Sequence, residues 1–204
     1  MRPITISFTP LAAAATFWLA GATGAGPFTP SVTATTDTLG HFATITSAAN
    51  LSAITFTLTG TDADNKPQTE TIVGPNATTV TGTKYWKTLT SISASATLGA
   101  STADFGIAAN AVSKTVPVNY IQASFNITHM VAVTGTINYD VEYTEQDIWT
   151  LTPSTLVWFN HATIVNKTAN FDGVTTSPIM GSRLAINSVT GGATISYTLL
   201  QGHR

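Results

Sequence analysis

Alternation of apolar and polar residues is the dominant pattern along this chain. At residues 54–59 Ile, Phe and Leu alternate with Thr, and at residues 137–143 Ile, Tyr, Val and Tyr alternate with Asn, Asp and Glu. Successive side chains of a strand point to opposite faces, so each segment predicts a strand with one buried and one exposed face. Similar short segments recur from residue 42 onward. The pattern predicts an all-β protein built from antiparallel strands.

Turn-forming residues predict how some of these strands connect. The stretch GTDADNKP at residues 60–67 favours a hairpin through glycine, Asx and proline turns. Gly135-Thr136 predicts a tight hairpin between residues 130–133 and 137–143, and Thr190-Gly191-Gly192 predicts a terminal hairpin between the last two strands. Residues 85–92 are expected to form one aromatic-rich strand, with Trp86, like Trp158 further along, in the core.

Short strands separated by turns every 8–12 residues or so favour antiparallel β-sandwich modules, Ig-like or jelly-roll-like. A chain of 204 residues fits two such modules in tandem. The residues before Pro117 have the character of a linker, so we expect domains at 29–110 and 117–204. Residues 1–28 are expected to form an extended N-terminal arm, in which Ile4, Ile6 and Phe8 alternate as in a strand.

The N-terminal stretch allows a second interpretation. A basic start, an apolar segment at Leu11–Ala20 and small residues after it are also typical of a signal peptide. The apolar segment is too short to span a bilayer. Its alanines make it the nearest approach to a helix in the chain, although it lacks helical periodicity and caps. We therefore prefer the ordered arm.

The composition favours a subunit of an assembly. Charged residues make up 9% of the chain, against roughly a quarter in ordinary soluble domains, and a surface with few charges does little to keep neighbours apart. A secreted or passenger-type β domain remains an alternative. The net charge is −2 and the eight basic residues are scattered, so we expect no nucleic-acid binding. Cysteine is absent, which excludes disulfides and thiolate chemistry.

Few residues form patterns that could carry chemistry. Asp62, Asp64 and Asn65 could hold calcium, but the glycine and distal glutamate of a calcium loop are missing, so a hydrogen-bonded turn is expected. Asp140 and Glu142 share a strand face, and a solvated face or a contact between subunits is expected there. The histidines are far apart in sequence and fit no metal or nucleophile motif: His41, His129, His161 and His203. We predict a protein that is not an enzyme, with no catalytic, cofactor-binding or metal-binding residues.

Aromatic and apolar residues are the remaining candidates, because Trp is favoured where protein surfaces associate. Phe17, Trp18 and Leu19 lie in the expected arm, and Trp149 lies in a polar loop. We predict that these four residues contact neighbouring subunits. An exposed Trp can also stack on a sugar, so a carbohydrate-binding surface is a second interpretation of Trp149.

Several stretches resemble a family of tailed-bacteriophage virion structural proteins. These stretches are ATITSAANLSAITFTLTGTDADNKPQTETIVGPN, TKYWKTLTSIS, GTINYDVEYT, VWFNHAT and PIMGSRLAINSVTGGATISYTLLQG, and together they cover most of the chain after residue 40. The phrase TGTDADNKPQTETI followed by KTLTSIS is the most distinctive. The resemblance implies a β-sandwich virion component without catalytic residues.

The resemblance also implies a setting. A capsid decoration or cement protein on the outer capsid surface, contacting the major capsid protein and further copies of itself as a homotrimer, is the role we favour. A tail or head–tail connector component and a carbohydrate-binding virion adhesin remain alternatives. In each case the chain is expected to be made in the cytoplasm of the host bacterium, with no contact to nucleic acid or membrane and no cofactor.

Overall fold

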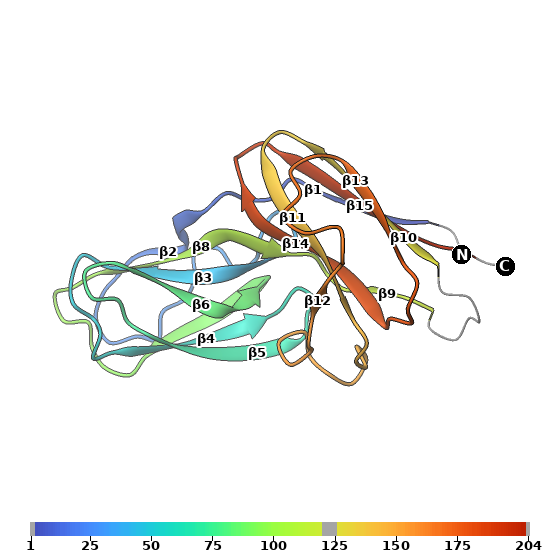
Figure 1. Ribbon diagram of the computed structural model, residues 1–204. Coiled ribbons are helices and arrows are strands. Elements are labelled where there is room, and N and C mark those ends of the chain that lie inside the picture. The colour runs from blue at the N-terminus through green and yellow to red at the C-terminus, as the bar shows by residue number, and fades with distance from the viewer. Residues whose placement is uncertain (1–2, 120–125, 203–204) are drawn as a thin grey trace. The chain divides into compact units, whose positions relative to one another are not determined.

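The computed structural model describes residues 3–119 and 126–202, and these residues form strands, turns and loops without any helix (Figure 1). The all-β prediction is confirmed. Within the described ranges there is accordingly no helix that could cross a membrane. In chain order the strands are β1 (Ile4–Phe8), β2 (Ala14–Ala22), β3 (Gly40–Thr46), β4 (Thr55–Thr61), β5 (Pro67–Val73), β6 (Thr79–Trp86), β7 (Thr88–Ala94), β8 (Ala103–Val112), β9 (Val116–Pro117), β10 (Ile127–Thr134), β11 (Ile137–Thr144), β12 (Phe159–Asn160), β13 (Phe171–Thr175), β14 (Gly181–Val189) and β15 (Thr194–Gln201).

The chain divides into two compact units. Unit 1 comprises the described parts of Met1–Ala12 and Val112–Arg204, and unit 2 comprises Ala13–Ala111. The division falls at the start of the expected linker. The first residues do not stand apart, because β1 belongs to unit 1 and β2 belongs to unit 2.

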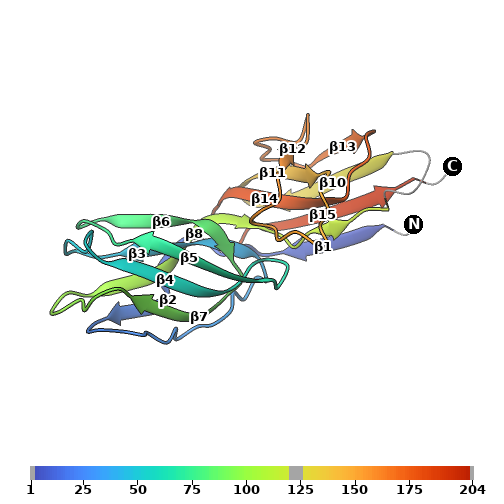
Figure 2. The ribbon, with the colours of Figure 1, turned by 90° about the horizontal axis from the view of Figure 1, so that it is seen from below.

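Unit 2 is built from two sheets around one core. One sheet has the strand order β2-β8-β3-β6 and the other has β5-β4-β7 (Figure 2). Buried and exposed residues alternate along β5, as the Thr-rich pattern predicts. The rings of Phe56 in β4 and Phe105 in β8 meet with centroids 5.4 Å apart. Side chains of both sheets therefore meet in the core, as in a β-sandwich.

A buried carboxylate also joins the two sheets of unit 2. Glu70 in β5 accepts a hydrogen bond from the indole N–H of Trp86 in β6, with a distance of 3.1 Å between Nε1 and Oε2. Its other oxygen accepts hydrogen bonds from the backbone N–H and the hydroxyl of Thr83. Three donors satisfy the buried charge, and this arrangement offsets much of its desolvation cost.

Unit 1 also has two sheets. One sheet has the order β1-β15-β10-β13, and the other contains β12, β11 and β14, with β9 also paired to β14. Along β15 the residues Ile195, Tyr197 and Leu199 are buried and alternate with more exposed residues. The Tyr197 hydroxyl lies 2.7 Å from the hydroxyl of Ser182 in β14, so a buried hydrogen bond connects the two sheets.

Two of the predicted hairpins are wrong. Strand β10 pairs with β13 and β15, whereas β11 pairs with β12 and β14. Strands β14 and β15 likewise belong to different sheets. The turns at Gly135 and Gly192, both with positive φ, carry the chain from one sheet to the other. Alternation shows which face of a strand is buried, but it does not identify the neighbouring strand.

The hairpin predicted at residues 60–67 is confirmed, because β4 and β5 pair from Thr55↔Val73 to Thr61↔Pro67. The single strand expected at residues 85–92 is not found. It breaks at Lys87, which separates β6 in one sheet from β7 in the other. Trp86 is fully buried, so its predicted core position is confirmed.

The N-terminal stretch forms two extended strands, and the alternation of Ile4, Ile6 and Phe8 does mark a strand, β1. All five residues of β1 pair with β15, from Ile4↔Leu199 to Phe8↔Ile195. Strand β2 pairs irregularly with β8. The two strands approach closely at Gly106, where a Cβ atom would lie 2.2 Å from the carbonyl oxygen of Ala14. Glycine is therefore required at this point of the β2–β8 contact.

The burial of Trp18 corrects its predicted role as a subunit contact. Its side chain is 0% exposed, with the Phe17 ring edge-on at 4.8 Å between centroids. A ring that its own chain covers completely has no surface left for a neighbouring molecule. Phe17 and Leu19, which lie on either side of Trp18 in β2, are half-buried.

We predict that Trp18→Ala lowers the free energy of unfolding by about 3–5 kcal/mol, because it leaves a large cavity in a packed core. Trp149→Ala is the matched control: that side chain is 70% exposed, and its removal should change stability by less than about 0.5 kcal/mol. Chemical denaturation followed by circular dichroism measures both values. Equal effects of the two substitutions would contradict the assigned burial.

Candidate functional site

The loop between β11 and β12 exposes several apolar side chains. We call residues 145–158 the aromatic loop. Trp149 is 70% exposed and Val157 is 49% exposed, and Leu151 is also open to solvent. Isolated apolar side chains are common on protein surfaces, but a group of them on one loop is typical of an interaction site. The loop is therefore the leading candidate for a functional surface.

Hydrogen bonds within the aromatic loop hold Trp149 in place. The carboxylate of Asp147 accepts the backbone N–H of Trp149 at 2.9 Å and the hydroxyl of Thr150 at 2.9 Å. The side-chain oxygen of Gln146 accepts the N–H of Val157 at 2.6 Å and so joins the two ends of the loop. The exposed indole thus belongs to a loop whose backbone is held by internal hydrogen bonds.

Two buried apolar residues pack the same loop against the rest of unit 1. Ile148 is 8% exposed and Leu156 is 7% exposed, so the residues next to Trp149 and Val157 point inward while those two point outward. Burial of Ile148 and Leu156 offsets the exposure of their neighbours. The loop consequently has a defined outer and inner side.

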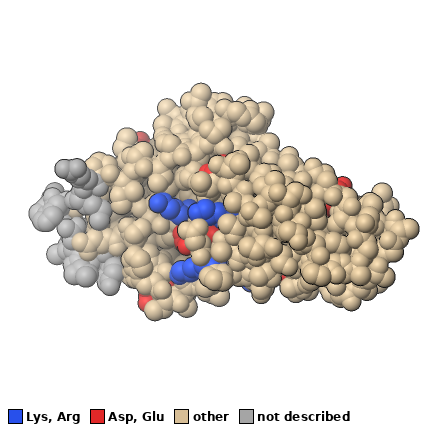
Figure 3. Space-filling view, turned by 180° about the vertical axis from the view of Figure 1, so that it is seen from behind, with Lys and Arg blue, Asp and Glu red and all other residues tan. Residues whose placement is uncertain are grey.

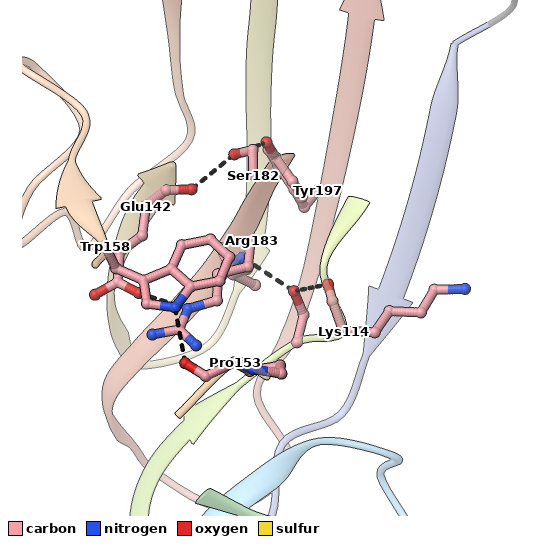
Figure 4. Close-up of polar contacts among 9 residues, drawn as sticks. Lys114, Glu142, Pro153, Trp158, Ser182, Arg183 and Tyr197 are labelled. Carbon is pink, nitrogen blue, oxygen red and sulfur yellow. Dashed lines mark hydrogen bonds and ion pairs between the residues drawn. The ribbon is translucent and has the colours of Figure 1, made fainter. Parts of the chain in front are cut away.

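An ion pair and a stacked aromatic ring form the base of the loop (Figure 4). Arg183 in β14 donates from Nε to the Glu142 carboxylate in β11 at 2.7 Å. The guanidinium carbon of Arg183 lies 3.9 Å from the centroid of the Trp158 ring, and the Trp158 N–H donates to the carbonyl of Pro153. The core position predicted for Trp158 is wrong, because its ring is only half-buried and covers the buried guanidinium of Arg183 from outside. The planar guanidinium satisfies both partners at once.

A buried histidine pair is a feature that the sequence did not reveal. His129 in β10 and His161, 32 positions later, meet with ring centroids 5.1 Å apart. The Nδ1 atom of His129 is 2.7 Å from the Tyr197 hydroxyl, and its Nε2 atom is 3.0 Å from the Thr175 hydroxyl. The hydroxyl of Ser182 contacts Tyr197 and donates to the carbonyl of Glu142. Because Tyr197 stands between Ser182 and His129, these residues do not form a nucleophile–base pair.

Burial favours the neutral form of both histidines. Desolvation, with a smaller contribution from His161, lowers the pKa of His129 to about 3. Desolvation also lowers the pKa of His161. A neutral imidazole ring has one hydrogen-bond donor and one acceptor, and each of the two hydroxyls beside His129 can either donate or accept. The arrangement therefore suits an uncharged hydrogen-bond network inside unit 1.

A third buried histidine, His41, lies in unit 2. His41 Nε2 is 2.8 Å from Asp37 Oδ2, and its Nδ1 is 3.1 Å from the carbonyl oxygen of Ala108. Both ring nitrogens of His41 thus lie within hydrogen-bond distance of an oxygen. The pair connects the segment before β3 to β8. His203, the fourth histidine, lies outside the described residues.

The acidic groups named from the sequence have structural partners. Asp62 Oδ1 accepts the backbone N–H groups of Asp64 and Lys66, each at 2.9 Å, as expected for a hydrogen-bonded turn. Burial raises the pKa of Asp62. Asp140 accepts the backbone N–H of Asn166, whereas Glu142 holds Arg183. No group of three or more potential metal-binding side chains occurs among the described residues.

No family model, no curated protein and no solved structure matches the chain.

We predict that Arg183→Ala destabilises the protein by about 2–4 kcal/mol, because it leaves the Glu142 carboxylate partly buried without its partner and removes the cation from Trp158. Arg183→Lys is the control, since it keeps the charge but loses the planar stack, and its effect should be intermediate. Denaturant titration measures the change. A loss below about 0.5 kcal/mol for Arg183→Ala would contradict a structural role of the pair.

We also predict that acid destabilises unit 1 through His129. The pKa of an unfolded histidine is about 6.5, so below this pH the unfolded chain binds protons that folded His129 does not. Its stabilising effect is complete above pH 6.5 and is lost as the pH falls toward 3, by up to about 1.4 kcal/mol per pH unit.

The test compares wild type with His129→Gln by urea denaturation between pH 7 and pH 5, where ordinary carboxylates stay ionised in both states. The substitution removes one ionisable group but retains hydrogen-bonding capacity. We expect a steeper loss of stability in the wild type than in the variant. Parallel pH profiles would show that His129 is not the responsible group.

Proposed function

We propose that this protein is a structural subunit of a tailed-bacteriophage virion, and that it decorates the outer surface of the capsid by contacting capsid subunits and copies of itself. The observation that carries the proposal is the braced aromatic loop. A protein that exposes Trp149 on a rigid loop gains by covering it against a partner. The sequence resemblance supplies the virion as the setting.

The distribution of charge supports a role in assembly. The chain has 8 Lys and Arg and 10 Asp and Glu residues, and Figure 3 shows a face on which charged atoms occupy only small areas. Charged groups that lose water at an interface without forming pairs weaken association. A surface with few charges avoids this cost when subunits pack together.

The side chains that could serve in catalysis already have structural tasks. Asp147 holds the loop backbone, Glu142 holds Arg183, and His129 and Ser182 are buried within hydrogen-bond networks. If any of these side chains left its contacts to take part in catalysis, its hydrogen-bond partner would be left unpaired. Contact surfaces on a stable scaffold are the function that this arrangement supports best.

The test begins with the location of the chain in purified phage particles, separated into heads and tails and analysed by mass spectrometry. We expect the chain in the head fraction. Purified protein should bind heads that lack it and raise their melting temperature, and Trp149→Ala should weaken binding about 10-fold or more, as expected for an aromatic hot spot.

Val73→Ala is the control for the binding measurement, because Val73 is 55% exposed on β5 and belongs to unit 2, whereas the aromatic loop belongs to unit 1. It should bind as wild type does. Absence of the chain from heads, or unchanged binding by Trp149→Ala, would overturn the decoration role. A carbohydrate-binding adhesin would instead lose glycan binding in the same Trp149 variant.

A further inference from the structure

Strand β13 is a short edge strand of unit 1 that buries little of its own surface. Among the described strands it pairs with β10, from Ile127↔Thr175 to Val131↔Phe171. Thr175 is the one buried residue of its five, and Val174 is 50% exposed. Apolar burial therefore contributes little to the attachment of β13, and segments of this kind open at a low cost in free energy.

The chain is anchored to the other sheet of unit 1 on both sides of β13. Before the strand, the Tyr139 hydroxyl donates to the carbonyl of Ala169 at 2.8 Å. After the strand, the N–H of Met180 donates to the carbonyl of Thr144 at 2.8 Å. We call residues 170–178, which lie between these two anchors, the β13 strap. Detachment of the strap from β10 leaves both anchors in place.

Two buried histidine rings contact the inner side of the strap. His129 lies across from Gly173, and its Nε2 atom is 3.0 Å from the Thr175 hydroxyl. His161 packs on Gly173, where an added Cβ atom would lie 2.6 Å from the Cε1 atom of the ring. The His161 ring also forms a hydrogen bond with the backbone of Val174. Three consecutive residues of the strap thus depend on these two rings.

His161 is fixed to the opposite sheet, so its contact with the strap is a contact between sheets. Its backbone N–H donates to the carbonyl of Val141 in β11 at 2.8 Å, and the N–H of Val141 donates to the carbonyl of Ile164 at 3.0 Å. The Nδ1 atom of His161 accepts the N–H of Thr163 at 3.3 Å. When the strap moves, the ring therefore stays with β11.

The closed strap disfavours a proton on either ring. His129 is 0% exposed and His161 is 3% exposed, so a charge on either ring would be cut off from water. The ring centroids are 5.1 Å apart, and two charged rings at this distance would repel each other. A protonated His161 would also lose the Nδ1 acceptor that Thr163 uses.

The surrounding groups do not compensate a charge on His129. The Tyr197 hydroxyl from β15 lies 2.7 Å from its Nδ1 atom, and burial raises the pKa of that tyrosine, so it stays uncharged. The charged side chains of the neighbouring elements have other positions or partners: Asp172 of β13 lies opposite the outward-facing Met130, Asp140 of β11 accepts the N–H of Asn166, Glu142 of β11 binds Arg183 of β14, and Lys167 lies over the Phe171 ring.

From this arrangement we infer that the β13 strap is an acid-released element: uncharged His129 and His161 hold it against β10 at neutral pH, and acid detaches it while the rest of unit 1 stays folded. Loss of Thr175 and Gly173 from their places opens the two rings to water, where each can take a proton. Residues 127–131 of β10 then present a free strand edge. The inference is independent of the proposed virion role.

Proton linkage gives the direction and the size of the pH effect. In the open strap the histidines have the ordinary pKa of about 6.5, whereas burial lowers both pKa values in the closed strap, that of His129 to about 3. The closed strap therefore has its full stability above pH 6.5 and loses it as the pH falls toward the closed-state values. Each histidine that opening exposes raises the open fraction by about 10-fold per pH unit in this window.

Amide hydrogen exchange of the full chain, followed by NMR between pH 7 and pH 5, measures this opening residue by residue. Strand β1 is the matched control within the same molecule, because it is also a five-residue edge strand of the same sheet and pairs with β15. Comparison of the two strands at each pH cancels the ordinary pH dependence of amide exchange.

We expect the protection of the β13 amides to fall below that of the β1 amides by about 10-fold or more per pH unit below pH 6.5. The amides of β15 should stay protected over the same range. Parallel profiles for β13 and β1 would overturn the inference. Loss of protection in β15 at the same pH as in β13 would also overturn it, because the whole unit would then be unfolding.

Variants identify the groups that take up the protons. His129→Gln and His161→Gln each remove one titrating ring but keep hydrogen-bonding capacity, so each should reduce the pH dependence of β13 opening, and the double variant should abolish it. Asp172→Asn is the control, because it removes the outward-facing carboxylate of the same strand and should leave the pH response unchanged. A selective acid response of β13 that persists in the double variant, or that disappears in Asp172→Asn, would assign the opening to another group and overturn the inference. If a histidine variant does not fold, the wild-type comparison and Asp172→Asn decide the question.

Discussion

One buried hydrogen bond, between the hydroxyls of Tyr197 and Ser182, positions much of unit 1. It joins β15 in one sheet to β14 in the other. Once Ser182 points inward to reach Tyr197, the alternation of a strand turns Arg183 to the opposite face. Arg183 there meets Glu142 and the Trp158 ring. A contact inside the core therefore determines the position of Arg183, and with it the base of the aromatic loop.

The same hydrogen-bond network contains two side chains whose pKa values are shifted by burial. Tyr197 contacts His129, and burial raises the pKa of the tyrosine as it lowers that of the histidine. Both changes favour the uncharged form. A core held by neutral hydrogen bonds avoids the cost of buried unpaired charge, and it makes the two sheets adopt one mutual position. Unit 2 has a related link, in which Glu70 and Trp86 join the two sheets.

The sequence was sufficient for the local structure of most strands. Alternation at residues 54–59 and 137–143 identified the buried faces of β4 and β11, and turn chemistry identified the β4–β5 hairpin. Pairing between distant strands could not be predicted. Strands β10 and β15 are separated by about sixty residues, and their alternation is equally compatible with any amphipathic neighbour.

Candidate site residues show the same limit. Trp149 was predicted from a polar loop, and such a loop seldom buries a large ring. Trp18 was misplaced, because the register of an irregular strand such as β2 cannot be inferred from its small neighbours. The meeting of His129 with His161 depends on how distant strands and loops pack together. No local sequence signal marks it.

The hydrogen bonds within the aromatic loop bear on the contact role proposed for Trp149. A flexible loop would have to be ordered on binding, with a loss of about 0.5–1.5 kcal/mol for each side chain immobilised. Asp147 and Gln146 form their hydrogen bonds before any partner arrives. That ordering is then part of folding, where burial of Ile148 and Leu156 offsets it. The backbone that carries Trp149 is therefore already held by hydrogen bonds before any partner binds, which lowers the ordering cost of the proposed contact.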